Sequence, residues 1–171
     1  MTLTTKETDL LKDLKTQEQL FIDKYTRYSQ QACDTGLKNL FDSICTTERT
    51  HLQTVTDILG GAEPHETTAP TATTAVYTGK STCDETSKQN DAYLCRDALA
   101  MEKHVSSVYD TCVFEFANPK LRDTLAHIQK EEQNHGEQLY TYLASNGLYN
   151  SYEESSRLRE LFSRAAPLCI Y

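Results

Sequence analysis

The chain has 171 residues, of which 38% are hydrophobic and 25% charged, and its formal net charge is −8. These values fit one globular domain and argue against a nucleic-acid or anionic-membrane partner, because both of those favour a basic surface. We expect no membrane span, because no apolar run approaches the roughly 20 residues that one needs, and no secretory signal, because residues 1–15 are polar and mixed in charge.

Long helices are favoured by the low content of glycine (6 residues) and proline (4 residues). Asp34 or Thr35 can cap the start of one helix, Gly60 can stop it, and the pair Asn118-Pro119 is a typical helix start. Apolar residues that recur every three or four positions predict four helices, at residues 6–33, 36–59, 89–117 and 119–145.

The predicted fold is all-α, an antiparallel four-helix bundle within residues 1–150. Residues 62–88 form the one long break, and their stretch rich in Thr, Ala and Pro suits a crossover connection along the bundle. Residues 151–171 are expected to form a short helix near 152–164, followed by a tail.

The inward-facing positions of the second and fourth predicted helices match at an offset of 84 residues. The expected core line of the first helix is Leu10, Leu14, Glu18, Phe21, Tyr25 and Tyr28; that of the second is Leu37, Phe41, Ile44, Glu48, His51, Val55 and Ile58. That of the third is Cys95, Leu99, Glu102, Val105, Tyr109, Cys112 and Phe116; that of the fourth is Leu121, Leu125, Ile128, Glu132, His135, Leu139 and Tyr142. The pattern predicts two helical hairpins related by a pseudo-two-fold axis.

Four carboxylates and two imidazoles fall within these apolar lines. Each half has a lone Glu and, 30 residues later, a Glu followed three positions on by His; the six residues are Glu18, Glu48, His51, Glu102, Glu132 and His135. A Glu and a His three apart share one helix face, so both can reach one ion. Such a set, one Glu from each of two helices and Glu-x-x-His from the other two, is the donor set of dinuclear carboxylate bundles.

We therefore expect these six residues to bind two metal ions, which would neutralise carboxylates that are costly to bury unpaired. Mixed oxygen and nitrogen donors favour iron first, with manganese or zinc as alternatives, over calcium or magnesium. The plainer interpretations are that Glu-x-x-His arises by chance on solvated faces, or that the bundle keeps the ligands without the metal.

Several neighbouring residues have an ambiguous role. Glu131 also stands four before His135, but it lies off the apolar line, so we interpret it as a solvated neighbour; His104 and His127 are expected at the surface or its boundary, and His65 in the loop. Tyr25 and Tyr109 each follow the lone Glu of their helix by seven residues. They are expected to hydrogen-bond to the ligands or to act in redox chemistry, and their plainer role is that of core aromatics with satisfied hydroxyls.

Six cysteines occur without any C-x-x-C pair, which argues against zinc knuckles and thioredoxin-like motifs. We interpret them as mostly reduced thiols of a cytosolic protein. Cys45, Cys95 and Cys112 are expected to act as small core residues, and Cys169 is the best candidate for an exposed thiol.

The second half resembles the spore coat protein F family, within the ferritin-like, rubrerythrin-type superfamily. The resemblance covers residues 101–150 and rests on Phe114-Glu115-Phe116, Asn118-Pro119, Leu121-Arg122, Glu131-Glu132, His135-Gly136 and Asn146-Gly147-Leu148-Tyr149. It implies a bundle protein made in the mother-cell cytoplasm and deposited in the spore coat, with other coat proteins as partners and a homodimer as the expected assembly.

Two functions compete at this point. In one, the dinuclear centre of a coat-type protein reacts with peroxide or dioxygen, as a di-metal oxidase, peroxidase or catalase would. In the other, the protein is a non-catalytic coat component in which metal only stabilises the bundle, or is absent. Rubrerythrin-type electron delivery is not expected, because the chain lacks a cysteine-based iron domain.

Overall fold

The computed structural model describes residues 2–63 and 79–149, and these form a bundle of four long helices. The helices are α1 (Thr5–Gln31), α2 (Thr35–Leu59), α3 (Glu85–Glu115) and α4 (Pro119–Ser145). The described residues contain no strand, so the predicted helical bundle is confirmed. The expected helix near 152–164, the tail and Cys169 lie outside the described residues, as does His65.

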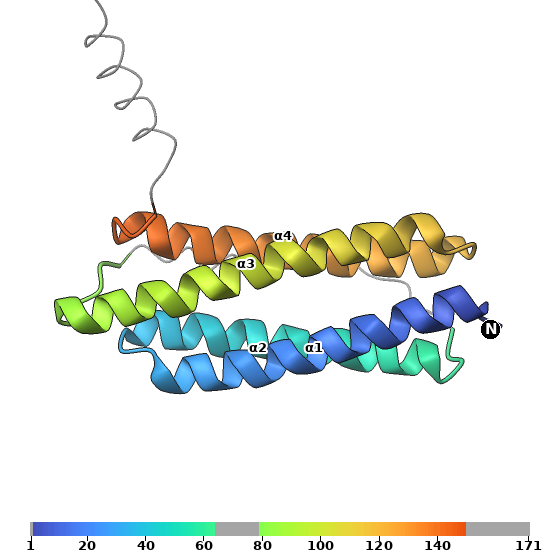
Figure 1. The fold of residues 1–171 in the computed structure, drawn as a ribbon, viewed down its shortest axis with the longest axis horizontal. Coiled ribbons are helices and arrows are strands. Elements are labelled where there is room, and N and C mark those ends of the chain that lie inside the picture. The colour runs from blue at the N-terminus through green and yellow to red at the C-terminus, as the bar shows by residue number, and fades with distance from the viewer. Residues whose placement is uncertain (1, 64–78, 150–171) are drawn as a thin grey trace, which may run out of the picture.

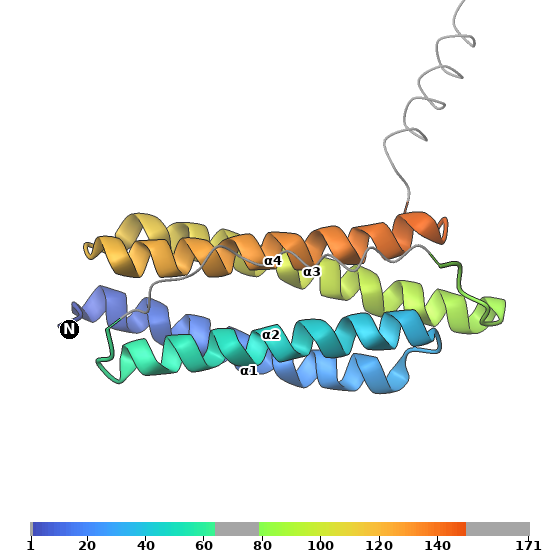
Figure 2. The same cartoon turned by 180° about the vertical axis from the view of Figure 1, so that it is seen from behind.

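Helices α1 and α2 form one hairpin and α3 and α4 the other, and the two hairpins lie against each other (Figure 1). Contacts between them run through α1 with α3 and α2 with α4. Seen from both sides, α2 and α3 run in the same direction (Figure 2). Residues 60–84 therefore connect opposite ends of the bundle, whereas α1–α2 and α3–α4 are joined by three residues each.

Polar side chains set the helix starts. Thr4 caps α1 in a capping box with Glu7, Asp34 caps α2 by accepting from the Leu37 amide, and Asn118 caps α4, where Pro119 follows. Helix α3 begins four residues before the predicted start, because the Asp84 side chain accepts from the amides of Thr86 and Ser87. It ends two residues earlier than predicted, because Phe116 is already extended (φ −91°, ψ 131°).

The predicted inward lines of α2, α3 and α4 are buried at every position. In α1 the line is shifted at both ends, since Leu11 is fully buried while Leu10 and Tyr28 are only partly covered. Ile22 also joins the core, which makes the buried stripe of α1 wider than predicted. None of the helices in the described part of the chain is both long and apolar enough to cross a bilayer.

Two buried carboxylates tie each hairpin to the loop of the other. Asp91 of α3 accepts from the amides of Cys33 (2.8 Å) and Asp34 (2.9 Å) in the α1–α2 loop. Glu7 of α1 accepts from the amide of Ala117 (3.1 Å) in the α3–α4 loop. Glu7 and Asp91, like Cys33 and Ala117, are 84 residues apart, so the pseudo-two-fold relation extends from the core to the loops.

Candidate metal centre

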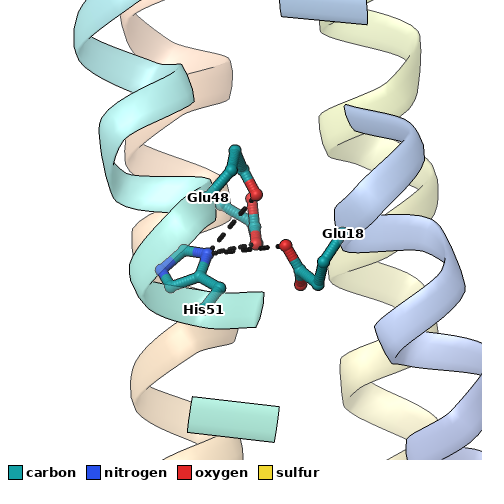
Figure 3. A group of neighbouring side chains, drawn as sticks. Glu18, Glu48 and His51 are labelled. Atoms are coloured by element: carbon teal, nitrogen blue, oxygen red, sulfur yellow. Dashed lines mark ion pairs between the residues drawn. The ribbon is translucent and has the colours of Figure 1, made fainter. Parts of the chain in front are cut away.

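All six residues of the predicted ligand set are buried in the middle of the bundle, and they come from all four helices. Their exposed fractions are 0% for Glu18, Glu48 and Glu132, 1% for His51 and Glu102, and 5% for His135. Figure 3 shows Glu18 of α1 pointing toward Glu48 and His51 of α2. The helical period produces this convergence, because each residue occupies the inward position of an otherwise apolar line.

The six side chains form two overlapping groups, each able to hold a metal ion. Within each group the potential ligand atoms all lie within 4.8 Å of one another. One group is Glu18, Glu48, His51 and Glu132; the other is Glu48, Glu102, Glu132 and His135. Glu48 and Glu132 therefore belong to both groups, whereas each lone Glu and each His belongs to one.

The two histidines present the same nitrogen to the centre. His51 Nδ1 lies 3.0 Å from Glu132 Oε1, 3.5 Å from Glu48 Oε2 and 4.0 Å from Glu18 Oε2. His135 Nδ1 lies 3.1 Å from Glu48 Oε1, 3.4 Å from Glu132 Oε2 and 3.7 Å from Glu102 Oε2. Each nitrogen is thus closest to the Glu of the opposite hairpin, so the two hairpins interlock at this point.

Many of the oxygen and nitrogen atoms that could bind a metal ion make no hydrogen bond, although several lie at ion-pair distance from a neighbouring Glu or His. The buried atoms without a hydrogen bond include Glu18 Oε2, both oxygens of Glu48 and of Glu132, Glu102 Oε2, and Nδ1 of His51 and His135. Buried polar groups in folded proteins are nearly always hydrogen-bonded, and an orphaned one costs about 1–3 kcal/mol. Orphaned oxygen and nitrogen atoms facing one another at these distances are what a pair of divalent cations requires, so the residues fit such ions.

Proton positions in the metal-free cluster follow from burial and mutual charge. Burial, followed by the charge of Glu132, raises the pKa of Glu18 and of Glu102 well above its ordinary value. Burial is the largest single influence on Glu132 and opposes its ionisation, but the charge of His51 and the contacts with both histidines and Glu102 together outweigh burial and lower the Glu132 pKa. Burial would lower the pKa of both histidines, yet the surrounding carboxylates raise it well above the usual range. Protons thus carry the compensating positive charge when no metal is bound.

Two tyrosines cross-brace the lone carboxylates. The hydroxyl of Tyr25 on α1 donates to Glu102 Oε1 on α3, and that of Tyr109 on α3 donates to Glu18 Oε1 on α1. Both rings are fully buried, and burial followed by the adjacent carboxylate raises the pKa of each phenol. Both tyrosines are therefore core aromatics with hydrogen-bonded hydroxyls, and the acceptors of these hydrogen bonds are candidate ligands.

Glu131 corrects the sequence interpretation. It is not merely a solvated neighbour: its side chain is 25% exposed and its Oε2 lies 2.9 Å from His51 Nε2, with His127 Nε2 at 3.5 Å. A His51 Nε2–H donated to this carboxylate leaves Nδ1 free to bind a metal ion. The counterpart of Glu131 on α2 is Thr47, whose hydroxyl donates to its own helix. The carboxylate partner that Glu131 provides for His51 is therefore not repeated at the matching position of α2.

The expectation of mostly reduced cysteines needs a correction as well. Cys33 and Cys83 form a disulfide across 50 residues of sequence, with their Cα atoms 6.4 Å apart. The Asp91 contacts hold the α1–α2 loop close to the start of α3, which brings the two cysteines together. Cys45, Cys95 and Cys112 are free and buried, as expected of small core residues.

With this geometry established, comparison with known families identifies one part of the chain. Residues 90–153 match the Coat F domain. The match supports the resemblance to the spore coat protein F family over α3 and α4. No curated protein and no solved structure matches the chain.

The Coat F segment contributes Glu102, Glu132 and His135 to the centre, and therefore one lone Glu and one Glu-x-x-His pair. The remaining three residues of the cluster lie on α1 and α2, outside the matched segment. Neither of the two groups is complete within the Coat F segment, because both include Glu48 of α2. The first hairpin is thus as necessary to the site as the matched one.

Proposed function

We propose that this chain is a spore-coat-type protein whose ferritin-like bundle holds a dinuclear metal centre, with Glu18, Glu48, His51, Glu102, Glu132 and His135 as ligands. The observation that carries the proposal is the sharing of Glu48 and Glu132 by two four-residue groups. Glu48 and Glu132 would serve both ions, and each group would add its own Glu and His. The parallel direction of α2 and α3, with one long connection, is the topology of ferritin-like bundles.

Iron is the first choice of metal and manganese the second. Carboxylate and imidazole donors suit both, and softer metals would favour thiolates. Cys95 and Cys112 lie elsewhere in the core and are not in either group. Two ions of charge +2 would balance four carboxylates and so replace the protons that neutralise the cluster in the metal-free protein.

The proposed chemistry is reaction with peroxide or dioxygen. Two redox-active ions would supply the electrons, and disproportionation of two H₂O₂ to O₂ and two H₂O balances without an outside donor. The chain's own contribution is to hold the ions between carboxylates, to exclude bulk water and to fix Glu18 and Glu102 through the phenols of Tyr109 and Tyr25.

The test is elemental analysis of protein isolated from spores of its native host, followed by an oxygen-electrode assay with peroxide. Two iron or manganese ions per chain and oxygen evolution support the proposal. Retained metal without turnover, together with a large fall in melting temperature on chelation, favours the alternative of a structural centre. A protein that holds no metal from any source refutes the dinuclear centre and leaves a structural coat component. Location and partners are tested by co-purification with other coat proteins from the spore fraction.

A further inference from the structure

A pocket of about 380 Å³ lies between α3 and α4, and two residues of the cluster are part of its lining. Its lining consists of Leu99, Glu102, Lys103, Ser106, Glu132, Gln133, Gly136, Tyr140 and Tyr149. Glu102 and Glu132 are almost wholly buried, and three of their four carboxylate oxygens have no hydrogen-bond partner. Two residues of the candidate centre therefore form part of the pocket lining.

The first hairpin has a corresponding pocket that does not reach the cluster. It lies between α1 and α2 and is lined by Lys15, Thr16, Gln19, Leu52, Gln53 and Thr56. Subtracting the offset of 84 from Leu99, Lys103, Gly136 and Tyr140 gives four of these six positions. Glu18 and Glu48, the counterparts of Glu102 and Glu132, are not part of its lining.

The residue that distinguishes the two pockets is Gly136, whose counterpart is Leu52. Gly136 lies inside α4, and it is not needed for an unusual backbone conformation, because the residues with positive φ in the described part of the chain are Gly61 and Gly147. A Cβ there would meet Leu99 Cδ1 at 3.7 Å and Glu102 Cβ at 3.8 Å, which is ordinary contact. Glycine within a helix costs about 1 kcal/mol relative to alanine. At this position the pocket between α3 and α4 has no side chain, whereas the pocket of the other hairpin has the Leu52 side chain in its lining.

We propose that the pocket beside Gly136 is the entry passage by which a divalent cation reaches the buried carboxylates, first at the group of Glu48, Glu102, Glu132 and His135. This inference rests on the proposed dinuclear centre and adds its route of loading. The counterpart pocket has Leu52 in its lining and includes neither Glu18 nor Glu48, so the proposal assigns loading to the α3–α4 face.

The outer part of the passage carries a positive charge and two aromatic rings. Lys103 Nζ lies 6.0 Å from the ring centroid of Tyr149, and that ring packs edge-on against Tyr140 at 5.0 Å. The ammonium repels an approaching cation, while the carboxylates deeper in the pocket attract it. Lys103 therefore slows loading without being a ligand, and reversing its charge should accelerate loading at low ionic strength.

The experiment is stopped-flow uptake of Co²⁺ by metal-free full-length protein, followed by the visible absorption of the bound ion. Replacing Gly136 with leucine should slow uptake about tenfold or more, because entry must then wait for local opening of the bundle. The final number of ions per chain should stay the same, since no ligand has changed. Gly136→Ala is the matched control, and it should load at nearly the wild-type rate because its Cβ fits.

Two further variants separate blocking of the passage from general damage. Leu52→Gly makes the same type of change in the first hairpin and should leave loading as fast as in the wild type or faster. Lys103→Glu should load several-fold faster at low salt and lose this gain at high salt. Uptake by Gly136→Leu at the wild-type rate overturns the entry passage while leaving the dinuclear centre intact. Failure of wild-type protein to bind Co²⁺ at all overturns the proposed function instead.

Discussion

The sharing of two carboxylates between two groups predicts different metal stoichiometries for variants that look alike. Glu18 belongs to one group and Glu132 to both, and both are fully buried. Removing one partner of a buried charge pair typically costs about 3–5 kcal/mol, which corresponds to roughly 10²–10⁴ in affinity. Glu18→Gln should therefore empty one position and keep the other, whereas Glu132→Gln should empty both. Glutamine keeps the size of the side chain and, at position 18, an oxygen for the Tyr109 hydroxyl.

The assay is equilibrium dialysis against Mn²⁺ or Co²⁺ at a free concentration about ten times the wild-type Kd, with elemental analysis of the protein. We expect two ions per chain for the wild type, one for Glu18→Gln and none for Glu132→Gln. Glu102→Gln should behave like Glu18→Gln, and the exposed Glu137→Gln should keep both ions. Equal losses in Glu18→Gln and Glu132→Gln would show that the two carboxylates are not shared in the way the geometry indicates.

Three other predictions concern stability and thiol reactivity. Replacing Tyr25 or Tyr109 with phenylalanine removes the hydrogen bond to a buried carboxylate oxygen. The free energy of unfolding of each metal-free variant should therefore fall by about 1–3 kcal/mol, and its melting temperature by a few degrees when followed by circular dichroism. An unchanged melting temperature would contradict a stabilising role of these hydrogen bonds. Replacing both Cys33 and Cys83 with serine removes the disulfide that links residues 50 positions apart. The free energy of unfolding, measured in urea, should fall by up to about 4 kcal/mol. Adding a reductant should not lower the free energy of unfolding of this variant any further. Burial raises the pKa of Cys112 to about 11, so iodoacetamide at pH 8 should leave this thiol unlabelled until the protein unfolds, as peptide mass spectrometry would show.

The sequence was sufficient to predict the core lines, because burial follows the 3.6-residue period directly. Glu48, His51, Glu132 and His135 occupy inward positions of helices whose other inward positions are apolar, and all four are buried. The end positions of α1 were less predictable: Leu10 and Leu11 are adjacent, and only the packing of α1 on the other helices decides which of them is covered. The start of α3 is also difficult to predict from apolar periodicity, because the cap at Asp84 lies in a polar stretch that has no such period.

The apolar periodicity of the sequence does not predict contacts between different helices and loops. Glu131 lies about 100° around its helix from Glu132, so the pattern placed it outside the core, yet it reaches His51 on the neighbouring helix. The sequence pattern also does not predict the contacts of Asp91 and Glu7, because their hydrogen-bond partners are backbone amides in loops of the opposite hairpin. The Cys33–Cys83 pair depends on the same loop contact and on a separation of 50 residues, too long for any local spacing rule.

Two departures from the pseudo-two-fold relation fall on opposite sides of the centre. Glu131, with Thr47 as its counterpart, gives His51 a carboxylate partner, and His51 belongs to the group that includes Glu18. Gly136, with Leu52 as its counterpart, opens the pocket to the group that includes Glu102. A charged partner on the outer nitrogen makes a histidine a stronger and better oriented ligand, whereas a pocket gives solutes access. In the proposed centre one group therefore has a histidine braced by a carboxylate, the other lies beside the pocket, and Glu48 and Glu132 belong to both.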